Sequence, residues 1–155
     1  MNNLFETLPE SSIVRKVIVP SEDFLTLATK GGRKKGYVNE EVVAEMPSPF
    51  SAGTEVELFY MPLRKGELTS AKRFHEILEE YGLKSDPRTH AADVAADPKF
   101  ADLHPSGSQW LDNDIKFCYA VFRLWPGARL VGVDQGARGW NGSWWLVGVR
   151  PVLGT

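Results

Sequence analysis

Apolar and polar residues alternate in two segments of the first third of the chain, as they do in strands with one buried face. In the segment 54–61, Val56, Leu58 and Tyr60 take alternate positions, and we predict a strand there. The segment 12–19 is rich in β-branched residues and is followed by a proline. It predicts a further strand, because branched side chains suit a pleated surface.

The alternation returns in the last part of the chain. It predicts one strand from Ile115 onwards, a second from Leu130 to Asp134 and a third from Trp144 to Val149. Pro126-Gly127 supplies the turn between the first two of these strands. Three strands in succession suggest an antiparallel meander.

Helical spacing lies between the two sets of strands. In the segment 69–81 apolar residues recur at intervals of three and four, polar residues at its start can cap a helix, and Gly82 suits the position after its end. Asp86-Pro87 opens a second helical stretch that reaches residue 96, and Asp97-Pro98 opens a short third one. Aspartate is a good cap, and proline is tolerated in a first turn.

The segment between the two N-terminal strands is less regular. Residues 24–30 fit either a short helix, started at Ser21, or a strand. Residues 31–36 contain three glycines and three cations, which predicts a loop. Residues 37–46 are ambiguous.

Strands, then helices, then a meander indicate an α+β fold. We expect an antiparallel sheet that includes the C-terminal three-stranded meander, with two or three helices packed on one face. The sequence shows no repeat and no linker, so we predict a single domain over residues 1–155. Its parts are a strand-rich segment 1–62, a helical segment 69–104 and an aromatic meander 110–150.

Composition narrows the class of protein. The chain has 155 residues, 43% of them hydrophobic, which is enough for a core without disulfide or metal staples. One cysteine favours a reducing compartment. The sequence has no signal-peptide pattern and no apolar run near the roughly 20 residues of a membrane span, so we expect a soluble, cytoplasmic protein. The net charge of −2 argues against broad nucleic-acid binding, which depends on neutralising phosphates.

All five tryptophans follow residue 105. Trp144 and Trp145 are adjacent, so in a strand they point to opposite faces, and a sheet covered on one face accepts only one of them in its main core. The other indole lies under a loop, packs against Trp140, or stands partly exposed as a binding platform. Arg150 can pair with Asp134 or stack on a tryptophan. The candidate binding residues are Trp140, Asn141, Trp144, Trp145 and Arg150. The alternative is that the indoles only fill the second face of the sheet.

A second candidate is an anion site in the glycine-rich segment. Successive backbone N–H groups in such a turn can bind an anion, and nearby cations strengthen the binding. The Lys-Ser/Thr ending of a phosphate loop is absent, because Tyr37 follows Gly36. The cations are Lys30, Arg33, Lys34 and Lys35. An exposed connector is the alternative.

Patterns for catalysis or metal binding are weak. The histidines His75, His90 and His104 show no paired ligand spacing, and we expect no metal and no cofactor. His104 is either oriented by the carboxylate of Asp102 or caps a turn. Cys118 lies inside an apolar strand, and we expect a buried structural cysteine rather than a nucleophile.

Three blocks of the sequence carry a family resemblance. They are His104-Pro105-Ser106-Gly107-x-x-Trp110, Cys118-Tyr119-Ala120-x-Phe122 and Trp144-Trp145-x-x-Gly148-Val149-Arg150. Over about residues 97–150 the chain resembles the C-terminal signature of small uncharacterised proteins from bacteria and their phages. That family has no assigned activity, so the resemblance implies a mobile-element origin and no site residue.

These patterns favour a binding protein over an enzyme, because no acid–base, nucleophile or metal constellation is convincing. We expect recognition of a macromolecular partner, most naturally a protein, and a host protein if the gene is phage-borne. The alternative is a small-ligand or carbohydrate-binding domain that uses the C-terminal tryptophans. An enzymatic role would require His104 and Asp102 in a cleft with a nucleophile.

Overall fold

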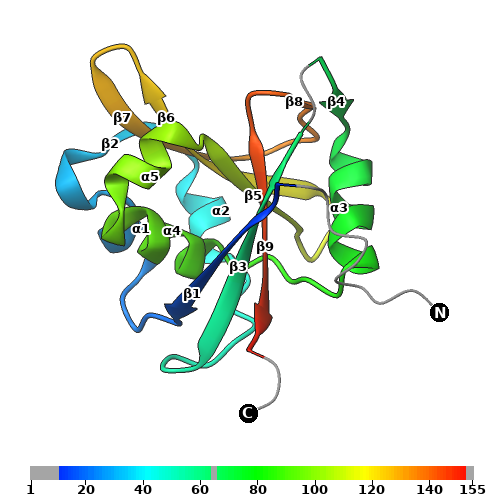
Figure 1. Cartoon of the computed structure of the whole chain (residues 1–155), viewed down its shortest axis with the longest axis horizontal. Helices are drawn as coiled ribbons and strands as arrows, with labels where there is room; N and C mark the ends of the chain where they lie inside the picture. Colours follow the sequence, from blue (N-terminus) through cyan, green and yellow to red (C-terminus); the bar gives the residue numbers. More distant parts are fainter. Residues whose placement is uncertain (1–10, 64–65, 153–155) are drawn as a thin grey trace.

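The computed structural model of the chain describes residues 11–63 and 66–152. In this part, seven strands form one sheet in the order β1-β3-β9-β5-β6-β7-β2, and β4 pairs with β8 in a separate ribbon (Figure 1). Neighbouring strands are antiparallel, except that β2 runs parallel to β7 and β5 parallel to β9. The strands are β1 (Ile13–Ile18), β2 (Lys34–Val38), β3 (Glu55–Pro62), β4 (Leu68–Thr69), β5 (Ser106–Leu111), β6 (Phe117–Trp125), β7 (Ala128–Gln135), β8 (Trp140–Asn141) and β9 (Trp145–Pro151).

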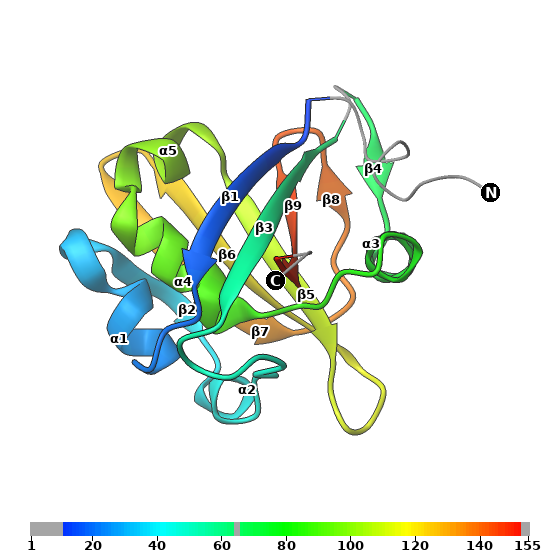
Figure 2. The ribbon, with the colours of Figure 1, turned by 60° about the horizontal axis from the view of Figure 1, so that its bottom comes forward.

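Helices lie on both sides of the sheet (Figure 2). Phe24 and Phe122 belong to the core under α1, α2, α4 and α5, whereas Phe74 and Leu146 belong to the core under α3. The expected helices on one face are therefore present, but α3 covers the other face. None of these helices has the length and apolar character needed to cross a lipid bilayer. Their bounds are α1 (Phe24–Ala28), the 3-10 helix η2 (Lys30–Gly32), α2 (Glu40–Ala44), α3 (Ala71–Glu80), α4 (Pro87–Ala96) and α5 (Pro98–Leu103).

Side-chain caps start the helices where the sequence indicates. Ser70 accepts a hydrogen bond from a first-turn N–H of α3, and Asp86 and Asp97 do the same for α4 and α5. The proline after each aspartate occupies a first-turn position, where its missing N–H breaks no helical hydrogen bond. Helix α3 ends before Gly82, whose φ of 66° lies in the region that favours glycine.

The α+β fold class is confirmed, and so are most predicted elements. The segments 12–19 and 54–61 contain β1 and β3, and the three predicted helical stretches are α3, α4 and α5. For residues 24–30 the helix is the right alternative. It is capped by the carboxylate of Asp23, which accepts from Thr26 N–H, and not started by Ser21.

The sheet contains a C-terminal three-stranded antiparallel meander, but its third member differs from the prediction. The meander consists of β5, β6 and β7, whereas β9 lies between β3 and β5. The pattern does not predict β5, because the sequence Ser106–Leu111 has polar residues at buried positions on both faces. Those polar groups find partners inside the fold, which only the tertiary structure provides.

The prediction of a loop over 31–36 is only half right. Lys34–Gly36 belongs to β2, which pairs along the edge of the sheet with β7. The ambiguous segment 37–46 contains the end of β2 and then α2, whose first-turn N–H groups donate to the Asn39 side chain.

Candidate functional site

The structure buries two of the candidate tryptophans. Trp140 is fully buried and Trp144 is 6% exposed, and their rings pack edge to face with centroids 5.6 Å apart. Trp140 Nε1 donates a hydrogen bond to Oε1 of Gln109, 3.0 Å away. These two indoles therefore belong to the core under α3 and present no open ring face to a ligand.

Trp145 packs on the other side of the sheet from Trp144, as their adjacency predicts. Its ring meets the imidazole of His104 edge to face at 4.8 Å. Asn141 lies exposed on β8, where its Oδ1 accepts hydrogen bonds from the backbone N–H and hydroxyl of Ser143. Trp145 is thus covered on the side of α5, and Asn141 is apart from it at the surface.

Arg150 contacts neither of its predicted partners. Its guanidinium lies 4.5 Å from the ring centroid of Phe59, and its Nε is 3.5 Å from Oε1 of Glu57. Both partners belong to β3, which pairs with β9. The predicted contact with Asp134 or a tryptophan is therefore wrong.

The cations of the glycine-rich segment do not converge on one point. Lys30 pairs with Glu22 at 2.9 Å, whereas Arg33 is buried and donates from Nη1 to the carbonyl oxygen of Leu130 at 3.0 Å. Burial lowers the pKa of Arg33. The two lysines that follow are exposed on β2. Of the four cations, only these two lysines are both exposed and without an ion pair in the described part of the chain.

His90 is enclosed between two serines of β5. Its Nδ1 lies 2.7 Å from Oγ of Ser108, and its Nε2 lies 2.8 Å from Oγ of Ser106. Burial lowers the pKa of His90 to about 3. A neutral imidazole has one donor and one acceptor nitrogen, so one serine donates to the ring and the other accepts from it. All three side chains are buried, which indicates a structural role.

Asp102 does not orient His104. Its carboxylate binds Arg129, with an Nη2 to Oδ2 distance of 2.7 Å, while Nδ1 of His104 donates to the carbonyl oxygen of Phe100 at 2.7 Å. His104 therefore caps a turn, as the second alternative states. Cys118 is free and buried, as predicted, and burial raises the pKa of its thiol to about 11.

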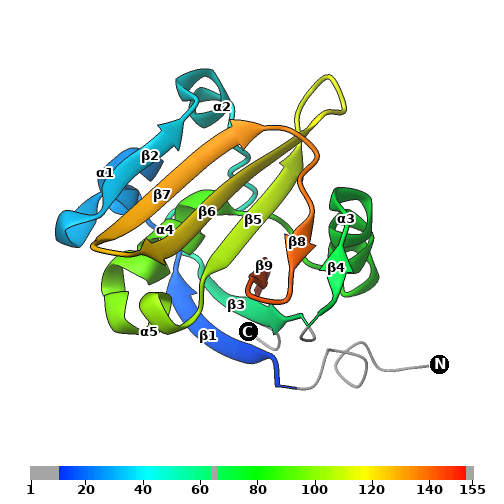
Figure 3. The same cartoon turned by 90° about the horizontal axis from the view of Figure 1, so that it is seen from above.

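The face of β2, β7 and β6 that points away from α1 and α4 is open. Figure 3 looks onto this face, and none of the described helices crosses in front of these three strands. A shallow hollow of about 340 Å³ lies on it. Its lining includes Tyr37, Tyr119, Arg123, Asp134 and Arg138.

Exposed aromatic rings surround this hollow. On β6, Tyr119, Arg123 and Trp125 occupy alternate positions and share the face, because successive strand side chains point to opposite sides. Trp125 is 53% exposed and Tyr37 on β2 is 66% exposed. The Arg123 guanidinium lies 4.4 Å from the ring centroid of Trp125. A cation and two accessible rings therefore lie on one surface.

Arg138 adds a second cation, held in an aromatic setting. Its Cζ is 5.1 Å from the ring centroid of Tyr119, 4.8 Å from that of Trp140 and 4.9 Å from that of Trp144. Its Nε is buried and has no hydrogen-bond partner in the part of the chain that the structure describes. Burial lowers the pKa of Arg138, and the charge of Arg123 lowers it further.

The two arginines repel each other without a balancing ion pair. Neither Arg123 nor Arg138 has a carboxylate oxygen within 4.0 Å among residues 11–63 and 66–152. Asp134 lines the same hollow, but its Oδ1 accepts from Asn39 Nδ2 at 3.3 Å. An added anionic group between the arginines would be attracted by both.

The sequence predictions missed four residues of this surface, namely Tyr37, Arg123, Trp125 and Arg138. A signal was present for two of them, because the period of two on β6 places Arg123 and Trp125 on the face of Tyr119. The pattern does not reveal which face of a sheet the helices leave open.

Comparisons of the chain with family models, with curated proteins and with solved structures found no match. The functional conclusion therefore rests on the chemistry of the open face.

Proposed function

We propose that this protein is a non-enzymatic binding protein whose open sheet face recognises a protein partner with carboxylates beside apolar groups. The supporting observation is that Arg123 and Arg138, which lack carboxylate partners in the described part of the chain, share this face with the exposed rings of Tyr37 and Trp125. Tryptophan, tyrosine and arginine dominate the binding energy of protein interfaces. A carboxylate makes its strongest hydrogen bonds with guanidinium groups.

A protein partner fits this face better than a nucleic acid does. A nucleic-acid strand needs a series of cations along its phosphates. Here two arginines share the face with Asp134, and the whole chain carries a net charge of −2. The partner is a cytoplasmic host protein if the gene is phage-borne, and the single free cysteine, Cys118, suits that reducing compartment.

A carbohydrate site on the predicted tryptophans receives less support. Stacking on a sugar requires an open indole face, and Trp140 and Trp144 are buried. Of the five tryptophans, all in the described part, only Trp125 is more than half exposed.

The test compares the wild type with the double variant Arg123→Ala/Trp125→Ala. Ile115→Ala is the matched control, because Ile115 is also exposed but lies in the loop between β5 and β6. Proteins are captured from an extract of the encoding organism, and the candidate is one retained by the wild type and the control but not by the double variant. Circular dichroism checks that all three chains are folded.

The purified candidate then decides the question. We expect at least about tenfold weaker binding to the double variant, since one interface anchor contributes about 2 kcal/mol or more. Amide signals of β2, β6 and β7 should shift when the partner binds. Unchanged affinity of the double variant would refute the proposal. Shifts of the same signals by an oligothymidylate, with no captured protein showing the required selectivity, would favour nucleic acid instead.

A further inference from the structure

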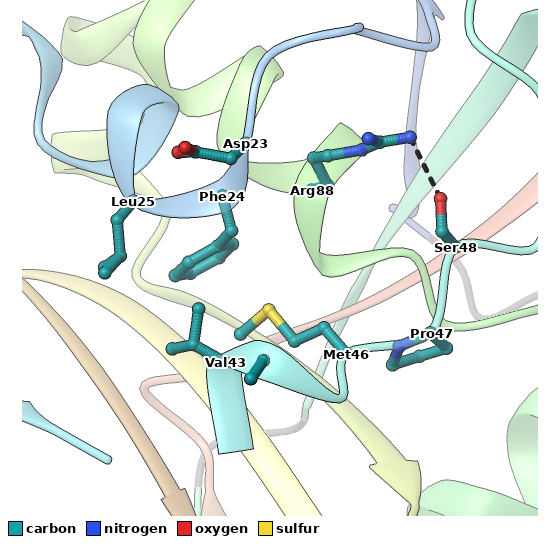
Figure 4. A pocket seen from close by; sticks show the side chains of 9 residues that line it. Asp23, Phe24, Leu25, Val43, Met46, Pro47, Ser48 and Arg88 are labelled. Atoms are coloured by element: carbon teal, nitrogen blue, oxygen red, sulfur yellow. Dashed lines mark hydrogen bonds between the residues drawn. The ribbon is translucent and has the colours of Figure 1, made fainter. Parts of the chain in front are cut away.

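A second hollow, of about 340 Å³, lies between α1 and α2 on the helix-covered side of the sheet (Figure 4). Phe24 and Leu25 of α1 face Val43 of α2 and Met46 across it. All four side chains are apolar, and all except Phe24 are only partly buried. The walls thus offer apolar surface to a small occupant, and the volume lies in the range of small-molecule sites.

A cation lines this hollow beside the apolar walls. Arg88 of α4 donates from Nη2 to Oγ of Ser48 at 2.9 Å, while its Nε is buried without a hydrogen-bond partner in the described residues. The same part of the chain places no carboxylate within 4.0 Å of its guanidinium nitrogens. The Arg88 side chain therefore retains donor capacity for an anionic group.

Asp23 is the acidic residue in the lining, and it is already engaged. Its Oδ1 accepts from Thr26 N–H at 2.8 Å as the cap of α1. Figure 4 shows its carboxylate directed away from the Arg88 guanidinium. It therefore does not neutralise Arg88.

We propose that this hollow binds an aliphatic carboxylate of medium length. The chain of the ligand would lie between α1 and α2, and its carboxylate would accept hydrogen bonds from Arg88. An apolar body gains from leaving water, and a guanidinium forms paired hydrogen bonds with a carboxylate. This site is independent of the open sheet face, which uses none of these residues.

Two methionines make the proposal testable within one spectrum. Met46 lines the hollow, whereas Met61 is buried in the core under α3. Protein labelled with carbon-13 at the methionine methyl groups is titrated with octanoate and, separately, with 1-octanol, and Met46→Leu assigns the signals. We expect saturable movement of the Met46 methyl with octanoate, a stationary Met61 methyl, and at least about tenfold weaker binding of the alcohol, which lacks the charge.

Variants separate the charge from the cavity. Arg88→Met keeps an apolar stem without the charge, and it should reduce octanoate affinity to that of octanol. Arg73→Met, on the exposed side of α3, removes the same charge elsewhere and should change nothing. Val43→Phe should fill the hollow and abolish binding. An unshifted Met61 methyl shows that each variant keeps the fold.

Three outcomes would overturn the proposal. They are equal affinity of the wild type for octanoate and octanol, octanoate binding that survives Val43→Phe, and movement of the Met61 methyl together with that of Met46. The first two tests do not depend on how well Arg88→Met folds.

Discussion

Gly107 of β5 lies against the indole of Trp140 so closely that a Cβ on Gly107 would overlap Cζ3 and Cη2 of the ring. The indole is fully buried, and its Nε1 is tied to Gln109 two residues further along β5. Gln109 in turn donates to the carbonyl oxygen of Ala71 at the start of α3. The glycine therefore makes room for a tryptophan that joins the sheet to a helix.

Gly107→Ala should destabilise the protein. The added methyl meets a large buried ring that has no free space, and overpacking of a core costs about 1–3 kcal/mol. Urea denaturation measures the free energy of unfolding. Gly36→Ala is the control, since a Cβ there would meet only the carbonyl oxygen of Val131 at 3.4 Å. Equal stability of Gly107→Ala and the wild type would contradict the packing.

Trp144 and Trp125 should respond oppositely to replacement by alanine. Trp144→Ala removes a buried ring from the core and should cost about 3–5 kcal/mol in unfolding free energy. Trp125→Ala removes a half-exposed ring whose contact with Arg123 is worth about 0.5–1 kcal/mol. Thermal and urea denaturation compare the two. A larger loss for Trp125→Ala would show that the exposed ring is the structural one.

His90 should make stability depend on pH. Its pKa is about 3 in the folded protein and returns to its ordinary value, about 6.5, on unfolding. Between these values the unfolded chain binds more protons, so stability falls as the pH falls from about 6.5 towards 3, by up to about 1.4 kcal/mol per pH unit.

Nitrogen-15 spectra of the imidazole ring provide the direct check, and they should show a neutral His90 at pH 5. Urea denaturation at pH 7 and pH 5 gives the slope, which should be smaller in His90→Gln, because that variant has no proton to bind at this position. A protonated His90 ring in the folded protein at pH 5 would refute the prediction.

Asp93 of α4 should couple β1 and β3 to that helix. Its buried carboxylate accepts from the Tyr60 hydroxyl at 2.7 Å and from Nε of Arg15 at 2.8 Å. Tyr60→Phe removes one hydrogen bond to a charged group and should cost about 1.5–3 kcal/mol. In an Asp93→Ala background the same change should cost less, with a coupling energy of at least about 0.5 kcal/mol. Additive losses in urea denaturation would mean that the two side chains act separately.

Local sequence chemistry determined much of the secondary structure. Helix α3 begins after Ser70 and ends before Gly82, and the turn between β6 and β7 falls at Pro126-Gly127. Capping and turn formation involve residues only a few positions apart, so a single sequence contains the whole signal.

The partners of the strands were decided by tertiary structure. β9 follows β7 and β8 in the chain, yet it pairs with β3 and β5. β5 carries no apolar alternation, because its serines bind His90 on one face and Gln109 binds Trp140 on the other. Such partners lie far apart in sequence, and the period of a strand does not specify its neighbours.

The tryptophans show both contributions. The sequence alone determined that Trp144 and Trp145 point to opposite sides of the sheet, because strand side chains alternate. Only the tertiary structure decided that both sides are covered at these two positions, by α3 on one and by the region of His104 on the other, while Trp125 lies at the surface. Alternation is a property of the backbone, whereas exposure depends on where distant helices pack.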